Sequence, residues 1–232
     1  MRVTDLVELT GASPVTVRRD LVELESLGAI SRTHGGVRPA FSRGSPLPFS
    51  ARLESDLDAK QALAEVAAGL VDDHESIIVD NGTTCLEVAR CLAGRPVTAL
   101  ALSLHAAAAL GSRPGAYVTV PGGPVETDSL AMTAGGLEVI RDVRADVAVL
   151  GACSASSTHG LTSTTYEDAA LKRAVIRASS RTILVAGAEK LSRSSTFRFG
   201  EPDDLTHLVT TKDAADDLLA LFTDAGVSIH LV

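Results

Sequence analysis

Hydrophobic positions follow two alternating periodicities along most of this chain. Short apolar runs, which predict buried strands, are separated by segments with apolar residues at helical spacing. We expect strands at 76–79, 97–102, 117–120, 147–150, 182–185, 208–209 and 227–231, and helices over 61–71, 84–92, 104–110, 130–140, 167–179 and 214–222. This alternation predicts an α/β fold, with a mostly parallel, doubly wound sheet covered by helices on both faces.

The first forty residues follow a different pattern. Ser13 is a favoured helix N-cap and Pro14 a favoured first helical residue, so a helix is expected to begin there. Its apolar stripe is formed by Val17, Leu21, Leu24 and Leu27, after which Gly28 ends the helix. Thr16 and Arg19 point away from that stripe, with Arg18 on its flank. The helix therefore has a core face and a polar, basic face.

The segments around this helix complete a small unit. Thr4 is expected to cap a short preceding helix, and Gly11-Ala12 forms the turn between the two helices. Residues 30–37 have strand-like ends around a polar, Gly-rich tip. Arginine suits both phosphates and guanine edges, so the pattern predicts a DNA-binding helix with a basic wing. The candidate DNA contacts are Ser13, Thr16, Arg18, Arg19, Arg32 and His34.

The run from Ser13 to Val37 resembles the DNA-reading head of DeoR-type bacterial repressors of sugar metabolism. The positions of that family's signature are filled by Ser13, Thr16, Arg18, Arg19, Asp20, Leu21, Arg32, His34, Gly35 and Gly36. Family members carry one more helix before the one near Thr4, so the resemblance implies a winged helix-turn-helix that lacks its first helix. Taken without the wing motif, a capped amphipathic helix with two arginines is more often an ordinary solvated surface helix.

The length of the chain and the distribution of its charges indicate two domains. The 232 residues divide into a predicted head at 1–38, a Pro- and Ser-containing linker at 39–58 and an effector-binding domain at 59–232. Residues 1–50 hold six arginines against five acids, a net charge of +1. The whole chain has a net charge of −8, so the remaining residues carry −9. A head so weakly basic needs to be presented in two or more copies, so we expect a homo-oligomer, a dimer or tetramer.

Other classes of protein are disfavoured. No apolar run is long enough to cross a membrane and the first residues do not open a signal peptide, so we expect a cytoplasmic protein. The three cysteines, at 85, 91 and 153, and the six histidines show no metal-ligand spacing. We therefore predict reduced thiols, no metal site and no cofactor.

Polar and glycine residues gather where predicted strands end. Asp80-Asn81-Gly82-Thr83-Thr84 lies between a strand and a helix, where free backbone N–H groups and the helix dipole favour an anion such as phosphate. Pro121-Gly122-Gly123 and Gly151 follow two further strands. Gly135-Gly136 interrupts a predicted helix, and we expect a close backbone approach there.

The body also resembles the effector domain of the DeoR-type regulators, which is similar to ribose-5-phosphate isomerase and the amino-sugar deaminases. The resemblance assigns an effector pocket to Asp80, Gly82, Thr83, Thr84, Gly122, Gly123, Gly151, Lys172 and Lys190, with Gly160 and Thr162 in a loop across the sugar. It implies that Gly82, Thr83, Thr84 and one lysine hold phosphate, whereas Asp80 and Lys172 face sugar hydroxyls. The alternative for Lys172 is a solvated position on its helix.

The chain departs from the family pattern at three places: Ala101-Leu102-Ser103, the segment Ala152 to Ser156, which has no carboxylate, and Ala188-Glu189. These departures predict a less polar pocket. The sequence as a whole predicts a DNA-binding transcriptional regulator, a repressor of carbohydrate metabolism genes controlled by a phosphorylated sugar.

Two alternatives stay open. The first is a phosphosugar isomerase or deaminase, with Asp80 as base and Glu167 or Asp168 as the nearest second carboxylate. The second is an oligomeric sugar-phosphate sensor that does not bind DNA.

Overall fold

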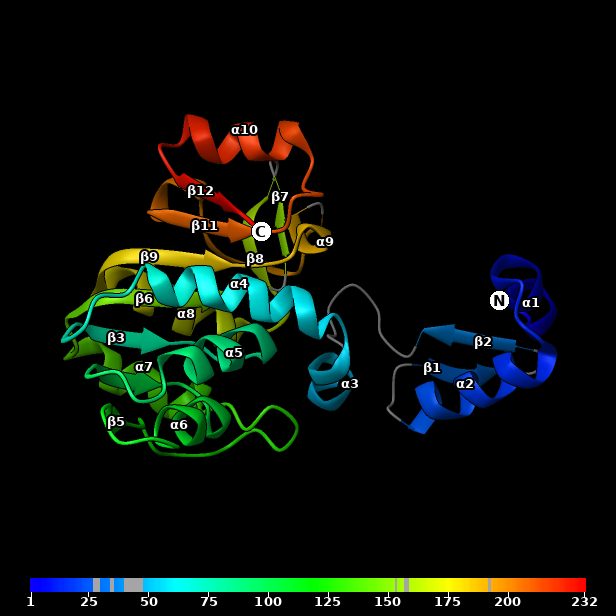
Figure 1. Ribbon diagram of the computed structural model, residues 1–232, viewed down its shortest axis with the longest axis horizontal. Helices are drawn as coiled ribbons and strands as arrows, with labels where there is room; N and C mark the ends of the chain where they lie inside the picture. The colour runs from blue at the N-terminus through cyan, green and yellow to red at the C-terminus, as the bar shows by residue number, and fades with distance from the viewer. Residues whose placement is uncertain (27–29, 34–35, 40–47, 153, 157–158, 192) are drawn as a thin grey trace. The chain divides into compact units, whose positions relative to one another are not determined.

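The structure, a computed structural model, describes residues 1–26, 30–33, 36–39, 48–152, 154–156, 159–191 and 193–232. The chain divides into two compact units, Met1–Ser55 and Asp56–Val232 (Figure 1). No helix within these ranges is both long and apolar enough to cross a membrane.

The first unit contains helices α1 (Val3–Thr10) and α2 (Pro14–Ser26), strands β1 (Ile30–Thr33) and β2 (Gly36–Pro39), and helix α3 (Phe49–Glu54). Its small core is formed by Val17, Leu21 and Val37, against which Val3, Leu6, Val7, Ala12 and Ile30 pack. The predicted order of two helices and a hairpin is confirmed.

Three details of this unit differ from expectation. Helix α1 begins after Arg2 and not at Thr4, because the Asp5 carboxylate accepts the Arg2 backbone N–H at 3.0 Å and closes the first turn. Leu24 is 40% exposed, since the helix extends beyond the few apolar residues that cover Val17 and Leu21. Leu27, Gly28 and residues 40–47 of the predicted linker lie outside the described residues, and the second half of that linker is helical rather than irregular.

The second unit is built on a seven-stranded sheet in the order β12-β11-β9-β6-β3-β4-β5, and every neighbouring pair is parallel. Its strands are β3 (Ser76–Val79), β4 (Thr98–Ala101), β5 (Tyr117–Thr119), β6 (Ala145–Gly151), β9 (Ser179–Val185), β11 (His207–Thr210) and β12 (Ser228–Leu231). The predicted parallel α/β architecture is confirmed.

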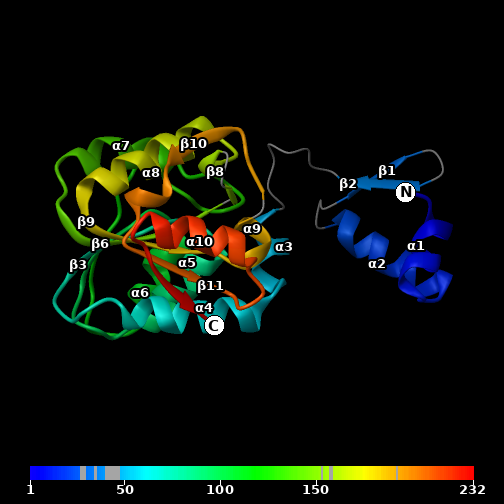
Figure 2. The same cartoon turned by 90° about the horizontal axis from the view of Figure 1, so that it is seen from above.

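Helices cover both faces of this sheet, so the fold is doubly wound. One apolar core lies under α4 (Leu57–Gly69), α5 (Thr83–Leu92) and α6 (Leu104–Leu110). The other lies under α7 (Thr133–Arg141), α8 (Tyr166–Ala178) and α10 (Asp216–Asp224). Figure 2 shows α7 and α8 above the strands and α4 and α6 below them.

A second, three-stranded antiparallel sheet was not predicted. It consists of β7 (Ser154–Ser156), β8 (Gly160–Ser163) and β10 (Phe197–Gly200) in the order β10-β8-β7. The short helices α9 (Ala188–Leu191) and η1 (Pro202–Asp204) flank β10 in sequence. Gly160 and Thr162 therefore lie in a strand and not in the expected loop. The Thr162 hydroxyl is buried and bonds to the Ser154 hydroxyl at 2.9 Å, a polar pairing without a hydrophobic signal.

The strand order reverses between β3 and β6, which are neighbours in the sheet although α5, α6 and α7 separate them in sequence. In open α/β sheets, ligands bind at the carboxyl ends of the strands where such a reversal occurs. Asp80 follows β3 directly and Gly151 ends β6. The fold thus brings two predicted site residues to its switch point.

Candidate functional site

The start of helix α2 is built as the sequence predicts. The Ser13 hydroxyl accepts the Thr16 backbone N–H at 3.1 Å, and the two hydroxyls are 2.8 Å apart. Ser13 is therefore the N-cap, and its side chain fixes the first turn of the helix. Arg18 and Arg19 are exposed on this helix, and the Arg19 guanidinium lies 3.7 Å from the Asp20 carboxylate. An exposed pair of this kind is weak, so it restrains the Arg19 side chain little.

The wing is an antiparallel pair in which Ile30 faces Pro39 and Thr33 faces Gly36. Met1 extends this pairing, because its backbone exchanges two hydrogen bonds with Val37 at 2.9 and 2.8 Å. Arg32 belongs to β1, but its side chain, like the whole of His34, lies outside the described part of the chain.

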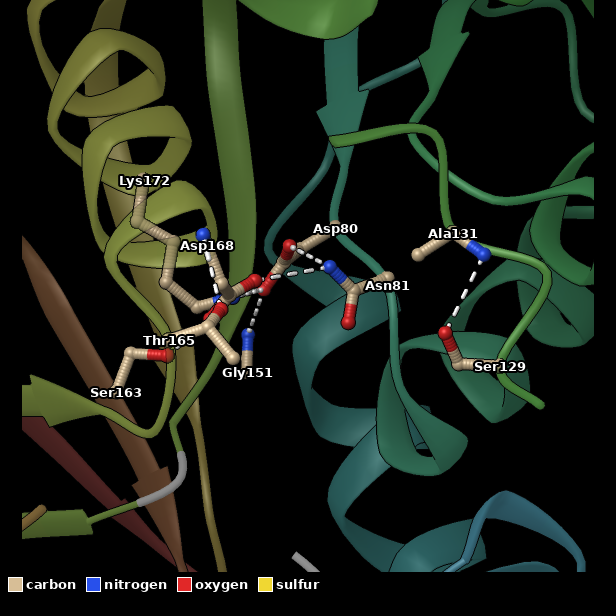
Figure 3. Close-up of polar contacts among 9 residues, drawn as sticks. All are labelled: Asp80, Asn81, Ser129, Ala131, Gly151, Ser163, Thr165, Asp168 and Lys172. Carbon is tan, nitrogen blue, oxygen red and sulfur yellow. Dashed lines mark hydrogen bonds and ion pairs between the residues drawn. The ribbon is translucent and has the colours of Figure 1, made fainter. Parts of the chain in front are cut away.

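The second predicted site is centred on two carboxylates and one lysine, Asp80, Asp168 and Lys172, here called the carboxylate–lysine cluster (Figure 3). The Lys172 ammonium donates to Asp80 Oδ2 at 2.7 Å and to Asp168 Oδ1 at 3.0 Å. Asp80 Oδ2 also accepts the Gly151 backbone N–H at 3.0 Å, which ties β3 to β6. Asp80 is fully buried and Lys172 is 3% exposed, so the alternative of a solvated lysine is wrong.

Two neutral side chains complete the hydrogen bonds of this cluster. The Asn81 amide donates to Asp168 Oδ1 at 3.1 Å and lies 3.3 Å from Asp80 Oδ1. The Ser163 hydroxyl, on β8, donates to Asp168 Oδ2. The unpredicted small sheet therefore contributes to the site, because its strand β8 supplies a hydrogen-bond donor to Asp168.

Burial and the ammonium act in opposite directions on the two carboxylates. Burial raises the pKa of Asp80 above 3.8, although Lys172 and the Gly151 N–H offset part of that effect. Burial also opposes ionisation of Asp168, but Lys172, Ser163 and Asn81 together lower its pKa. The partners of Asp168 therefore favour its ionised form, whereas burial favours the protonated form of Asp80.

The amino end of α5 borders the same residues. Gly82 has φ of +110°, a conformation that favours glycine, and it offers no side chain to cap the helix. Thr83 and Thr84, the first two helical residues, are buried. An uncapped helix start with two hydroxyls has the groups that an anion requires.

Cys85 and Lys190 belong to this neighbourhood. Cys85 Sγ lies 3.4 Å from the position that a Gly151 Cβ would occupy. Burial and the nearby Asp80 raise the pKa of the Cys85 thiol, whereas the charges of Lys172 and Lys190 act to lower it. Lys190 lies on α9 and is half-buried.

Gly122 and Gly123 lie against the start of α7. A Cβ on Gly135 would come within 2.0 Å of the Gly122 carbonyl oxygen, and one on Gly136 within 2.8 Å of Leu171 Cδ1. The predicted close approach at Gly135-Gly136 is confirmed. Helix α7 begins at Thr133 and not at Leu130, because Leu130 has φ of +52° and Ala131 pairs with Ser103.

Sequence reasoning missed the roles of three residues. Asp168 was considered only as a candidate acid of an enzyme, and Asn81 and Ser163 were not assigned to the pocket. One signal was present, since Asp168 and Lys172 are four residues apart and therefore share one helix face. Asp168 adds a carboxylate to this part of the site, and the expectation of a less polar pocket stays a prediction.

A capped recognition helix with a wing, joined to a doubly wound domain with a polar switch-point site, defines a helix-turn-helix regulator with a sensor domain. Residues 1–42 match the DeoR-like helix-turn-helix domain and residues 55–212 match the DeoR C-terminal sensor domain. The chain therefore belongs to the DeoR family and is a DNA-binding transcriptional regulator.

Curated relatives are similar in sequence to this protein along most of its chain. The regulator GolR of Listeria innocua is 28% identical over 231 residues, which cover 99% of this chain and 91% of GolR. The repressor AccR of Agrobacterium fabrum is 33% identical, covering 88% of this chain and 81% of AccR. The glycerol-3-phosphate regulon repressor of Haemophilus influenzae is 30% identical, covering 89% and 81%. Because these relatives are regulators, the enzyme alternative is not supported.

Among solved structures, ribose-5-phosphate isomerase A of Methanocaldococcus jannaschii is 19% identical with a TM-score of 0.43, covering 59% of this chain and 55% of that one. The chain thus matches about half the length of that structure.

Proposed function

We propose that this regulator represses carbohydrate metabolism genes and that a phosphorylated sugar bound in its sensor domain controls its affinity for operator DNA. The observation that carries the proposal is the buried carboxylate–lysine cluster at the switch point of the sheet. A buried, hydrogen-bonded set of charges beside an uncapped helix start is costly for stability alone, and it is well suited to bind a polar ligand.

The charges suggest how the ligand lies. Two carboxylates and one ammonium give the cluster a formal charge of −1, which repels a phosphate. The phosphate therefore belongs at Gly82, Thr83 and Thr84, with Lys190 as the nearby cation, and sugar hydroxyls belong at Asp80, Gly151 and Lys172. Gly122 and Gly123 form the remaining wall of the proposed pocket. The name of the Haemophilus influenzae relative, which refers to glycerol-3-phosphate, supports a phosphate ester.

On the DNA side, we propose that Arg18, Arg19 and Thr16 face the major groove and that Ser13, Arg32 and His34 reach phosphates. Control by the ligand requires that it bind the DNA-competent and incompetent states with different affinity. Two heads in a homo-oligomer would read two half-sites. Since operator DNA lies in the cytoplasm of prokaryotic cells, we infer that location.

A thermal-shift screen tests the ligand assignment. Each phosphorylated sugar is compared with its unphosphorylated parent on the full chain, on Lys172→Ala and on Thr83→Ala. A true effector at one hundred times its Kd contributes about 2.7 kcal/mol, which raises the melting temperature by about 5–10 °C. We expect this shift for the wild type only. If no phosphorylated sugar stabilises the wild type, the pocket assignment fails.

Operator binding tests the DNA assignment independently. In a titration against selected DNA, Arg18→Ala and Arg19→Ala are each expected to weaken operator binding by about 1–3 kcal/mol and to relax sequence specificity, as the loss of a major-groove base contact does. Arg113→Ala, an exposed arginine of the other unit, is the matched control. Unchanged affinity in both head variants would contradict the proposed contact surface.

A further inference from the structure

A basic groove lies between helices α7 and α8, and its lining includes no residue of the carboxylate–lysine cluster. It has a volume of about 470 Å³, and its charged lining consists of Arg141, Arg144, Arg173 and Arg177, with no acid. The remaining lining is apolar: Leu137, Ile140, Ala170, Ala174 and Ala178. Arg141 and Arg177 are exposed and have no ion-pair partner within the described ranges. This concentration of arginine is unexpected in a unit whose sequence is strongly acidic.

The opposite charge gathers at helix α10 and the turns before it. Between residues 201 and 224 the sequence has seven acids and a single lysine, Lys212. On α10, Asp217, Ala220 and Asp224 follow one another at helical spacing and all three are exposed. Asp217 and Asp224 have no ion-pair partner among the residues that the structure describes. Helix α10 therefore presents an acidic face with a small residue at its centre.

The groove and the acidic face belong to the same side of the sheet, because α7, α8 and α10 all cover one apolar core. A two-fold axis on this side would place α10 of one copy over the α7–α8 groove of the other, and the reverse contact would form at the same time. Such a contact is self-complementary, as a closed dimer interface requires. The alanines on both surfaces allow close helix packing, and the opposite charges set the register.

We infer that this regulator dimerises through its sensor domain, with the acidic face of α10 from each copy seated in the arginine-lined groove of the other. The inference rests on the proposed homo-oligomer and adds the surface that forms it. Each dimer would then supply two reading heads, which compensates for the weak basic charge of a single head.

Paired charge reversals test this interface on the full chain. The first variant carries Arg141→Glu and Arg177→Glu, and the second carries Asp217→Lys and Asp224→Lys. Sedimentation or light scattering is expected to give half the wild-type mass for each variant alone, because the substituted residues then face side chains of the same charge. Mixing the two variants restores the wild-type mass, since each groove then meets an opposite charge. A chain carrying all four substitutions also recovers the wild-type mass.

The mixing result separates the interface from misfolding, because two unstable chains would not restore each other. Melting curves of each variant provide a second check, and Arg113→Glu with Arg193→Glu is a control that changes the net charge equally at other exposed positions. If both variants keep the wild-type mass, another surface forms the oligomer and this interface is wrong. A monomeric wild type would overturn oligomerisation itself, while the thermal-shift result would still report separately on the sugar-phosphate site.

Discussion

The reading head and the sensor domain differ in where the central charged side chains of their candidate sites lie: they are exposed in the head and buried in the sensor domain. In the head, the arginines of α2 are exposed and the described core cluster is only Val17, Leu21 and Val37. In the sensor domain, Asp80 and Lys172 are buried between two large apolar cores and satisfied by hydrogen bonds. A surface that reads DNA needs accessible charge, whereas a pocket that discriminates a small ligand needs fixed, desolvated charge. The two units should therefore respond differently to substitution.

The largest effect is expected from Lys172→Met in the sensor domain. The substitution leaves two buried carboxylates without their ammonium, and unpaired buried charges of this kind cost about 3–5 kcal/mol. Urea unfolding of the full chain measures the loss. A change below about 1 kcal/mol would mean that the carboxylates find water or other partners.

The pH dependence of this variant gives a second test. Burial already raises the pKa of Asp80, and loss of Lys172 raises it further. The folded state then binds more protons than the unfolded state, so the variant regains stability as pH falls. Combining Asp80→Asn with Lys172→Met should recover much of the loss at neutral pH. Lys212→Met, an exposed lysine, is the matched control.

The next effect concerns the close approach of α7 to the Gly122 loop. Gly135→Ala places a methyl group 2.0 Å from the Gly122 carbonyl oxygen, and overpacking of this kind costs about 1–3 kcal/mol. Gly69→Ala at the end of α4 meets no atom within 4 Å and should stabilise by about 0.5–1 kcal/mol. Thermal unfolding of both variants measures the difference, and equal effects would contradict the assigned packing.

Removal of one helix N-cap in each unit allows a direct comparison of the local stability of the two units. Ser13 caps α2 in the head and Ser103 caps α6 in the sensor domain, each through its hydroxyl at 3.1 Å from a backbone N–H. Alanine at either position should cost about 1 kcal/mol locally. Because the head has the smaller core, we expect hydrogen exchange of the α2 amides to accelerate about fivefold in Ser13→Ala. Ser103→Ala should leave α2 protection unchanged, and Ser13→Asn should restore it.

A smaller effect is expected at the edge of the main sheet. Burial, followed by the charges of His230 and Arg181, lowers the pKa of His207 below 6.5. As pH falls through that value the unfolded state binds the proton first, so stability declines. The melting temperature should drop by about 1 °C between pH 7 and 5.5, and less in His207→Gln. His74→Asn, which tolerates the positive φ of His74, serves as the control. No difference between the variants would refute the assignment to His207.

Sequence patterns predicted the regular parts of both units. Strand β3 and helix α6 have the predicted bounds, because each combines a clear apolar pattern with polar ends. The β7–β8–β10 sheet was missed because its strands are short and rich in Ser, Thr and Gly, and their stability comes from contacts distant in sequence. The start of α7 shifted for a similar reason, since tertiary pairing of Ala131 overrides local helix propensity.

The site was predictable in part. The strand-end pattern located Asp80 and Gly151, and the family resemblance added Lys172, all of which meet at the switch point. The pairing of Lys172 with Asp168, and the hydrogen bond from Ser163, depend on how α8 and β8 pack beside β3. Hydrophobic periodicity predicts which face of a helix is buried, but it does not predict which polar side chain of another element will bond to that face.

The most direct test of the account is operator binding with and without the phosphorylated sugar that gives the largest thermal shift. We predict that saturating ligand changes the operator Kd of the wild type at least tenfold, a coupling of about 1.4 kcal/mol. Thr83→Ala, which removes a hydroxyl from the proposed phosphate site, should bind the operator normally and lose this response at the same ligand concentration. An operator Kd that is unaffected by bound ligand in the wild type, or an undiminished response in Thr83→Ala, would contradict the central claim.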